Sequence, residues 1–244
     1  MSQVIALIPA RSGSKGVIDK NIKKLGKFPL VQWSIEACKK IKTIDKIIVS
    51  TDSPEYRDLC IKFGAEVPFL RPKTISGDLS TDTDFIIHAL YWLKDNESEP
   101  DLIVHIRPTT PLRDPRVIDH AIETFKSSKG FTSLRSVHQM AESAYKNFEI
   151  SESGNLVSVF TKNPALDISN NARQSFQDTF IPNGYVDILS TKYIRDSGNI
   201  HGDKVMPYIT ETVSEIDNDF DFQYIEYQLI SQTHLIKKIF HQEK

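Results

Sequence analysis

The sequence predicts an α/β fold in which an open, mostly parallel sheet is flanked by helices. Short, continuously apolar segments such as residues 4–8, 46–50 and 101–106 are typical of strands that are covered on both faces. Amphipathic segments with helical spacing separate these strands, and this alternation is the pattern of a parallel sheet. The chain has 244 residues, of which 39% are hydrophobic and 25% charged, so it is long enough for one large domain.

The expected elements follow one another in a regular order. After the strand at 4–8, Pro29 can begin a helix that carries apolar residues on one face. The strand at 46–50 is followed by Ser53 and Pro54, which resemble the N-cap and the first position of a helix. Further along, the same periodicities predict a helix over 84–94, a strand over 101–106 and a helix from Pro115.

The middle of the chain departs from this alternation. Strand-like pieces such as "YKNFEI" lead into a polar, loop-rich stretch that ends before "NGYVDIL". We interpret residues 138–182 as an inserted excursion, either a lid or the arm of a dimer. With no repeat or flexible linker in the sequence, we expect a single domain over residues 1–244.

A binding site is expected along one rim of the sheet, because ligands of open α/β sheets bind beyond the carboxyl ends of the strands. That rim brings together residues 9–20, 51–52 and 107–113. The first of these segments, "PARSGSKG", combines flexible glycines with Arg11 and Lys15. Glycines allow the backbone to approach an anion closely, and the two cations suit phosphate oxygens.

The opening loop matches neither of two common phosphate motifs. It lacks both G-x-x-x-x-G-K-[ST] and G-x-G-x-x-G, which argues against a P-loop hydrolase and a dinucleotide-dependent dehydrogenase. From the residues alone, the loop is either a solvated turn or a cradle for a triphosphate whose outer phosphates leave as pyrophosphate.

Composition excludes several other functions. A formal net charge of −2 does not indicate a general nucleic-acid surface. The N-terminal segment has neither a basic lead nor a long apolar run, so we expect no signal peptide and no membrane partner.

Cys38 and Cys60 lack metal-ligand spacing and are expected to be buried free thiols in a reducing cytoplasm. The seven histidines form no metal-binding pattern, and the opening-loop serines have no histidine–acid partners for nucleophilic catalysis.

Several longer motifs resemble one enzyme family. They are "IALIPARSGSKGVIDKNIKKLGKFPL", "IIVSTD", "RPKTISGD", "RPTTPLR", "ARQSFQDTFIPNG" and "SEIDNDFDF", and together they extend over nearly the whole chain. They resemble the bacterial CMP-sugar synthetases, the acylneuraminate and related cytidylyltransferases. The resemblance implies a Rossmann-related, nucleotide-diphospho-sugar transferase-like fold. It also implies a cytoplasmic homodimer in which residues 138–182 reach towards the partner's site.

The same resemblance implies a reaction and the residues that serve it. CTP would activate a sialic, legionaminic or related 2-keto sugar acid, giving a CMP-sugar and pyrophosphate. Catalytic roles fall to Arg11, Lys15 and Asp217. The positions that match the family's nucleotide-binding residues are Ala10, Arg11, Ser12, Gly13, Lys15, Lys20, Asn21, Arg71 and Asp78. The positions expected near the acceptor sugar are Asp82, Thr83, Arg107, Thr109, Arg173 and Asn183.

A metal site is expected near the C-terminus. Glu215 and Asp217 occupy alternate positions and would point the same way in an extended segment. Carboxylates of this kind hold Mg²⁺ or Mn²⁺, and the family has metal-binding aspartates here, one of which Glu215 replaces. Asp219 and Asp221 are expected to begin the last helix.

Several of these residues also have structural interpretations. Lys20, Lys23, Lys24 and Lys27 suit a solvated basic face, which we favour for the last three. Arg71 has a surface ion pair as its alternative. Asp52 either caps the next helix or lines the site, and one residue among Asp78, Thr81, Asp82 and Thr83 should be an N-cap.

The acceptor side departs from the family pattern at two positions. Ile181 stands where sialic-acid enzymes often have a second arginine, and Arg107 stands where they commonly have glutamine. An added guanidinium could meet an acceptor phosphate, so a sugar-1-phosphate nucleotidyltransferase, such as a hexosamine-1-phosphate guanylyltransferase, remains the rival hypothesis. A nucleotide-binding regulator without catalysis is a further alternative.

Overall fold

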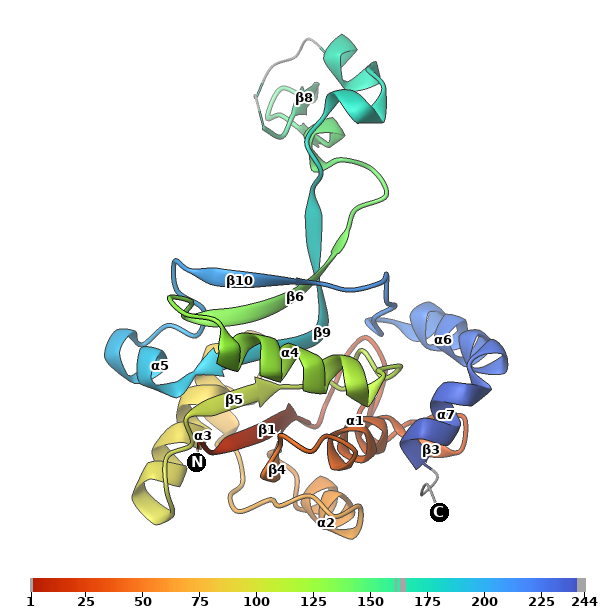
Figure 1. Ribbon diagram of the computed structural model, residues 1–244. Coiled ribbons are helices and arrows are strands. Elements are labelled where there is room, and N and C mark those ends of the chain that lie inside the picture. The colour runs from red at the N-terminus through yellow and green to blue at the C-terminus, as the bar shows by residue number, and fades with distance from the viewer. Residues whose placement is uncertain (1, 161, 163–165, 241–244) are drawn as a thin grey trace.

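A six-stranded sheet forms the centre of the molecule (Figure 1). The computed structural model describes residues 2–160, 162 and 166–240. The strand order is β10 (Val205–Ile209), β6 (Ser133–Gln139), β9 (Phe180–Ser190), β5 (Leu102–His105), β1 (Val4–Pro9) and β4 (Lys46–Ser50). β1 runs parallel to β4 and β5, and β10 runs parallel to β6, whereas β9 is antiparallel to both of its neighbours. The prediction of an open, mostly parallel sheet is confirmed.

Helices cover both faces of the sheet because strand side chains alternate between the faces. Val4, Ala6 and Ile8 pack in one cluster, which includes residues of α1 (Leu30–Lys39) and α4 (Pro115–Ser127). One residue of α2 (Pro54–Lys62), Cys60, joins the same cluster. Ile5 and Leu7 pack in the opposite cluster, with α3 (Asp82–Asn96) and α5 (Thr191–Ser197).

The helix starts follow the capping chemistry of the sequence. Ser53 accepts a hydrogen bond from the backbone nitrogen of Tyr56, and Pro54 is the first residue of α2, as predicted. Thr81 is the N-cap of α3, where it forms a capping box with Asp84. α3 is therefore longer at both ends than the predicted helix over 84–94.

A third cluster joins the two ends of the chain. α6 (Asp219–Ser231) and α7 (Thr233–Phe240) pack against α1 and the short hairpin of β2 (Lys24–Leu25) and β3 (Phe28–Pro29). The rings of Phe28 and Phe240 stack with their centroids 3.7 Å apart. Asp219 and Asp221 lie in the first turn of α6, so the prediction that they begin a helix is confirmed, but α6 is not the last helix, because α7 follows it. The apolar residues of α7 complete this third cluster.

An arm of residues 140–179 projects from the sheet (Figure 1). β6 and β9 pair as far as Gln139 and Phe180, so the ends of the predicted excursion are part of the main sheet. In its described residues the arm contains the two-stranded sheet of β7 (Phe148–Ile150) and β8 (Leu156–Ser158) and three 3-10 turns. "YKNFEI" is not one strand, because its first two residues belong to the turn Ala144–Lys146. Residues 161 and 163–165 lie outside the described part of the excursion.

None of the helices in the described part of the chain combines the length and the apolar character needed to cross a bilayer.

Candidate active site

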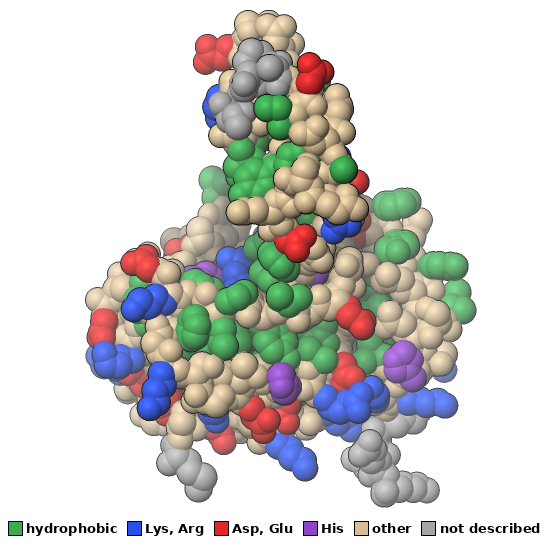
Figure 2. Space-filling model, turned by 45° about the horizontal axis from the view of Figure 1, so that its top comes forward, with side chains coloured by type: hydrophobic (Ala, Val, Ile, Leu, Met, Phe, Trp, Pro, Cys, Tyr) green, Lys and Arg blue, Asp and Glu red, His purple; other side chains and the backbone are tan. Residues whose placement is uncertain are grey.

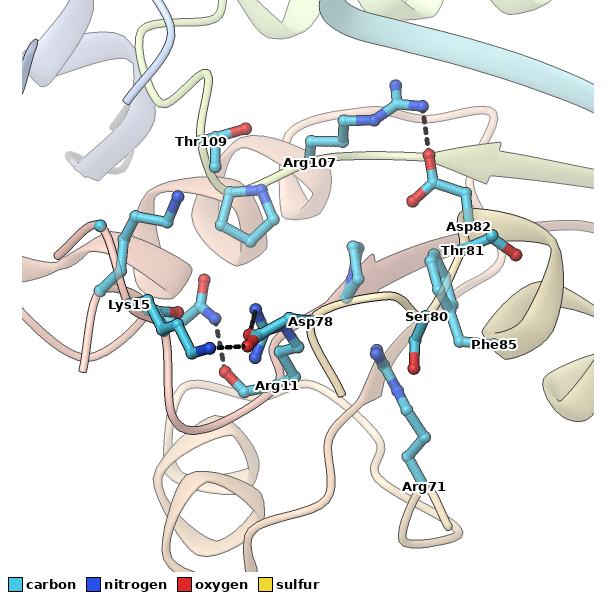
Figure 3. Close-up of a pocket in the computed structure, with 16 residues that line it drawn as sticks. Arg11, Lys15, Arg71, Asp78, Ser80, Thr81, Asp82, Phe85, Arg107 and Thr109 are labelled. Carbon is cyan, nitrogen blue, oxygen red and sulfur yellow. Dashed lines mark hydrogen bonds and ion pairs between the residues drawn. The ribbon is translucent and has the colours of Figure 1, made fainter. Parts of the chain in front are cut away.

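A cavity of about 530 Å³ opens beyond the carboxyl ends of β1 and β5. Its walls come from the loop after β1, the segment that precedes α3 and the turn after β5 (Figure 3). Nine of the predicted site residues line it: Arg11, Lys15, Lys20, Asn21, Arg71, Asp78, Asp82, Arg107 and Thr109. The cavity therefore lies where the strand–helix alternation placed a site.

The loop after β1 is held in shape by hydrogen bonds with Asp52 and Asn21. The backbone nitrogen and the hydroxyl of Ser12 each donate to the carboxylate of Asp52, both at 2.7 Å. Burial opposes ionisation of Asp52, but the hydrogen bonds from Ser12 lower the pKa of this carboxyl below its ordinary value. The amide of Asn21 donates to the carbonyl oxygen of Arg11 at 2.9 Å. Asp52 neither caps α2 nor lines the cavity, so both interpretations of it are wrong.

Arg11 and Lys15 share one acidic partner (Figure 3). Asp78 accepts from Arg11 at 3.0 Å and from Lys15 at 2.5 Å, one carboxylate oxygen for each cation. The hydrogen bond from Lys15, followed by the one from Arg11, lowers the pKa of Asp78. Two cations that converge on a single carboxylate form a site with excess positive charge, to which a polyphosphate would bind strongly.

Arg71 is buried, and its orientation is determined by the end of β4. Nε donates to the hydroxyl of Ser50 at 3.0 Å, and Nη2 donates to the Ser50 carbonyl oxygen at 2.8 Å. The guanidinium lies over the ring of Phe85, 4.6 Å from the centroid. Burial lowers the pKa of Arg71 to about 10. The alternative of a surface ion pair is wrong, because the side chain is only 5% exposed and its partners are neutral.

The loop after β1 also contacts the segment that precedes α6. Lys20 donates from Nζ to the carbonyl oxygen of Ile216 at 2.9 Å, and burial lowers the pKa of this lysine. A Cβ at Gly16 would lie 2.1 Å from the carbonyl oxygen of Asp217, so only glycine fits there. These two contacts hold the opening loop and the acidic segment together.

The two predicted metal ligands lie beside the cavity and not among the residues that line it. Glu215 accepts a hydrogen bond from the hydroxyl of Thr110 at 3.3 Å and packs on Gly184, where a Cβ would come within 2.1 Å of its Oε1. Asp217 is exposed, and its backbone nitrogen donates to Asp221 at the start of α6. No group of three or more His, Cys, Asp and Glu residues suited to a metal occurs among the described residues, of which His241 is not one.

Arg107 bridges two acidic side chains from different elements. Nη1 donates to Asp187 of β9, and Nη2 donates to Asp82 at the start of α3, each at 2.7 Å. Arg135 lies 3.8 Å from the other oxygen of Asp187. Asp187 itself is 1% exposed, and these two arginines supply cationic partners for its buried carboxylate.

Arg113 supports the turn that carries Arg107. Its fully buried guanidinium donates to the carbonyl oxygens of Tyr185 at 2.7 Å and Gly184 at 2.9 Å, and also to that of Arg107. Burial lowers the pKa of Arg113 to about 10. This arginine is part of "RPTTPLR" but was not predicted as a site residue. Its contacts run to β9, more than seventy positions away.

Comparison with known proteins identifies the family. A family model described as cytidylyltransferase matches residues 5–237 of this chain. The chain belongs to the cytidylyltransferase family. This result confirms the resemblance seen in the sequence motifs.

Two curated relatives and one solved structure show how far the similarity extends. This cytidylyltransferase is 30% identical to a CMP-N,N'-diacetyllegionaminic acid synthase of Legionella pneumophila, over 92% of this chain and 95% of the relative. It is 31% identical to an N-acylneuraminate cytidylyltransferase of Escherichia coli, over 91% of this chain but only 51% of that protein. In structure it resembles a CMP:2-keto-3-deoxy-manno-octonic acid synthetase complexed with CTP. The TM-score is 0.67 at 13% identity, over 95% of this chain and 100% of the other, a likeness of fold alone.

Some predicted site residues of the cytidylyltransferase do not line the cavity. Ala10, Ser12 and Gly13 belong to the loop but stand outside the lining, as does Thr83 of α3. Asn183 is buried beside the cavity, where its amide donates to the hydroxyl of Thr210 at 2.6 Å. Arg173 lies on the arm and donates to the carbonyl oxygen of Met140 at 3.2 Å. The predicted residues therefore lie in several places: the cavity, the loop beside it, α3, β9, the arm and, for the metal ligands, the segment before α6.

Sequence reasoning also omitted residues that do line the cavity. Ser14 and Gly16 come from the opening loop, and Ser80, Thr81 and Phe85 come from the start of α3. Thr81 was considered only as an N-cap and Phe85 only as a core residue of its helix. Phe85 serves the core and also faces Arg71. Helical periodicity detects the first of these roles and not the second.

Proposed function

We propose that this cytidylyltransferase transfers the cytidylyl group of CTP to a nonulosonic or related 2-keto sugar acid. The anomeric hydroxyl oxygen of the sugar forms a bond to the α-phosphorus, the bond from that phosphorus to the bridging oxygen breaks, and pyrophosphate leaves. The hydroxyl proton passes to a base or to solvent. The products are a CMP-sugar and pyrophosphate.

The charge distribution of the cavity carries this proposal. Arg11, Lys15, Lys20 and Arg71 line one part of it, and Asp78 is the carboxylate placed between the first two. A triphosphate would supply the negative counter-charge for these cations. Cations that are already in place also stabilise the charge that develops on the departing pyrophosphate. Because Arg11 and Lys15 release Asp78 when phosphate oxygens take its place, Asp78 also acts as an exchangeable counterion.

The residues near the acidic segment fit a divalent metal. Glu215 and Asp217 offer oxygen donors, and both contribute electrostatically at the ammonium of Lys20, which lines the cavity. Mg²⁺ binds through one or two carboxylates together with substrate phosphates, so a complete set of protein ligands is not required. When bound, Mg²⁺ or Mn²⁺ would supply charge neutralisation at the α-phosphate. Lys20 would hold the acidic segment close to the phosphate loop.

We also propose a cytoplasmic homodimer joined through the arm. Large apolar side chains are exposed on the arm, and they gather on the projecting part of the surface (Figure 2). They include Phe148, Ile150, Leu156, Phe160 and Ile168. Burying such a group against a second copy would stabilise the pair and could bring Arg173 to the partner's cavity. The buried free thiols Cys38 and Cys60 support a reducing compartment.

One screen tests the proposed reaction. Purified protein is assayed for pyrophosphate release with CTP and GTP, each crossed with sugar acids and with sugar 1-phosphates. Turnover is expected with CTP and a sialic, legionaminic, pseudaminic or octulosonic acid. Turnover with GTP and a sugar 1-phosphate would instead establish the rival nucleotidyltransferase, and CTP binding without turnover across the panel would indicate a regulator.

A further inference from the structure

Arg107 and Asp82 occupy the part of the cavity furthest from the shared Asp78 carboxylate in Figure 3. Their ion pair, at 2.7 Å, joins the turn after β5 to the start of α3. Asp82 is the first residue of α3, but Thr81 and Asp84 make the capping box, so the helix start does not depend on the Asp82 side chain. The Asp82 carboxylate is 39% exposed, and only one of its oxygens, Oδ2, is bonded to Arg107.

The charges around Arg107 balance without an added anion. Arg107 and Arg135 supply two positive charges, while Asp82 and Asp187 supply two negative charges. His105 is fully buried beside Asp187, and burial lowers its pKa well below the ordinary value, so its ring is neutral. Near the loop after β1, by contrast, the two cations Arg11 and Lys15 share the single carboxylate of Asp78. The two ends of the cavity therefore differ in their need for negative charge.

We propose that Arg107 is a positioning residue that holds Asp82 as the hydrogen-bond acceptor for an uncharged donor group of the sugar, a hydroxyl or an acylamino N–H. Both terminal nitrogens of Arg107 are engaged by carboxylates, and Asp187 is too deeply buried to be released at low cost. An acceptor phosphate would have to displace Asp82 and would then lie beside that carboxylate. Arg107 thus selects against a sugar phosphate, although its charge alone suggests the opposite.

This inference rests on the proposed function, because it concerns the acceptor half of the same cavity. The inference predicts whether Asp82→Asn raises or lowers the KM for the acceptor sugar. If Asp82 accepts a hydrogen bond from the sugar, Asp82→Asn raises the acceptor KM on the order of 10-fold or more, since a hydrogen bond to a charged group is lost. If Arg107 instead bound an acceptor anion, the same change would free its guanidinium and lower the acceptor KM.

The experiment uses the full chain, CTP and the sugar acid that gives the fastest turnover in the screen. Steady-state pyrophosphate release is measured for the wild type, Asp82→Asn, Arg107→Gln and the double variant. Asp95→Asn, the same change at an exposed position near the other end of α3, is the matched control and should keep the wild-type KM for both substrates. Thermal melting of each variant reports whether it is folded.

Because Arg107 acts through Asp82, Arg107→Gln should also raise the acceptor KM, and the double variant should equal Asp82→Asn. The KM for CTP should change less than about threefold in all three variants.

Three outcomes would overturn this inference and leave the proposed function standing. They are a fall in the acceptor KM of Asp82→Asn, new turnover with a sugar 1-phosphate, and additive effects in the double variant. If the wild type turns over no sugar acid with CTP, the proposed function fails and the inference fails with it. If Asp82→Asn does not fold, Arg107→Gln decides: an unchanged acceptor KM overturns the inference.

Discussion

The ammonium of Lys20 donates a hydrogen bond to the backbone carbonyl oxygen of Ile216, 196 positions further along the chain and 2.9 Å away. The neighbouring Gly16 lies so close to Asp217 that no Cβ could be added without a shift. Ile216 is itself buried in the cluster that joins α6 and α7 to the first quarter of the chain. The loop after β1 and the proposed metal ligands are therefore parts of one packed unit.

Replacing Lys15 with alanine should reduce pyrophosphate release on the order of 10²-fold or more, because a donor to the developing charge of the leaving group is lost. Stopped assays of pyrophosphate with saturating CTP measure the effect. Lys27→Ala removes a lysine that is exposed and not part of the cavity lining, and it should leave turnover unchanged. Near-normal turnover in Lys15→Ala would remove this lysine from the mechanism.

Gly16→Ala should impair activity by displacing the backbone around Asp217, although it removes no functional group. The new methyl group would overlap the carbonyl oxygen of Asp217, which must move together with the acidic segment. We expect at least a tenfold fall in kcat/KM and a lower melting temperature. At Gly77 an added Cβ would make only an ordinary contact, 3.9 Å from the hydroxyl of Ser80, so Gly77→Ala is the matched control. Equal activity in the two variants would contradict a tight contact at Gly16.

Removal of divalent metal with a chelator should abolish turnover, and added Mg²⁺ should restore it. Asp217→Asn should raise the Mg²⁺ concentration needed for half-maximal activity on the order of 10-fold, because an amide oxygen is a weaker ligand than a carboxylate. Asp58→Asn changes an exposed carboxyl on α2 and should leave the titration unaltered. An unchanged Mg²⁺ titration in Asp217→Asn would exclude that residue from the metal site.

Light scattering at assay concentration should give the mass of two chains. Replacing Ile150 and Ile168 together with glutamate should yield monomers, because both side chains are more than half exposed on the arm and would bring charge into the interface. Ile61→Glu adds the same charge at an exposed position on α2 and should leave the dimer intact. A monomeric wild type would contradict the proposed assembly.

Asp114 should stabilise the fold in a pH-dependent way. Burial raises its pKa, but hydrogen bonds from Arg116 and Lys238 prevail and lower it to about 2. A carboxyl whose pKa is lower in the folded state stabilises that state above its unfolded pKa, near 4, and loses this effect as the pH falls towards 2. Asparagine keeps the N-cap of α4 but not the charge, so Asp114→Asn should cost about 1 kcal/mol at pH 7 after solvent screening.

Urea denaturation from pH 7 down to pH 3 measures this difference in the free energy of unfolding. The difference between wild type and Asp114→Asn should shrink as the pH falls below about 4. A difference that stays constant over this range would show that the charge of Asp114 contributes nothing to stability.

Sequence alone was enough to predict the parallel strands on either side of β1, the presence of Arg11 and Lys15 in the cavity lining, and the family. Strands that are buried on both faces are continuously apolar, and the caps of α2 and α3 use side chains within a few residues of the helix start. Arg11 and Lys15 could be selected for the same reason, because they follow directly from the end of β1. These features depend on neighbours in the chain, so the order of residues is enough to indicate them.

Which carboxylate each cation contacts follows from the fold and could not be predicted from the order of residues. Asp78 and Asp82 come from the segment around the start of α3 and Asp187 comes from β9, and each accepts from an arginine that is distant in sequence. In sequence, Arg107 is an added positive charge that suggests an acceptor phosphate. In the fold, two buried or half-buried carboxylates balance that charge, because β9 inserts next to β5 and α3 begins at the same rim. The sequence shows that Arg107 is charged, but whether a counterion already lies beside it depends on the side chains that the fold brings there.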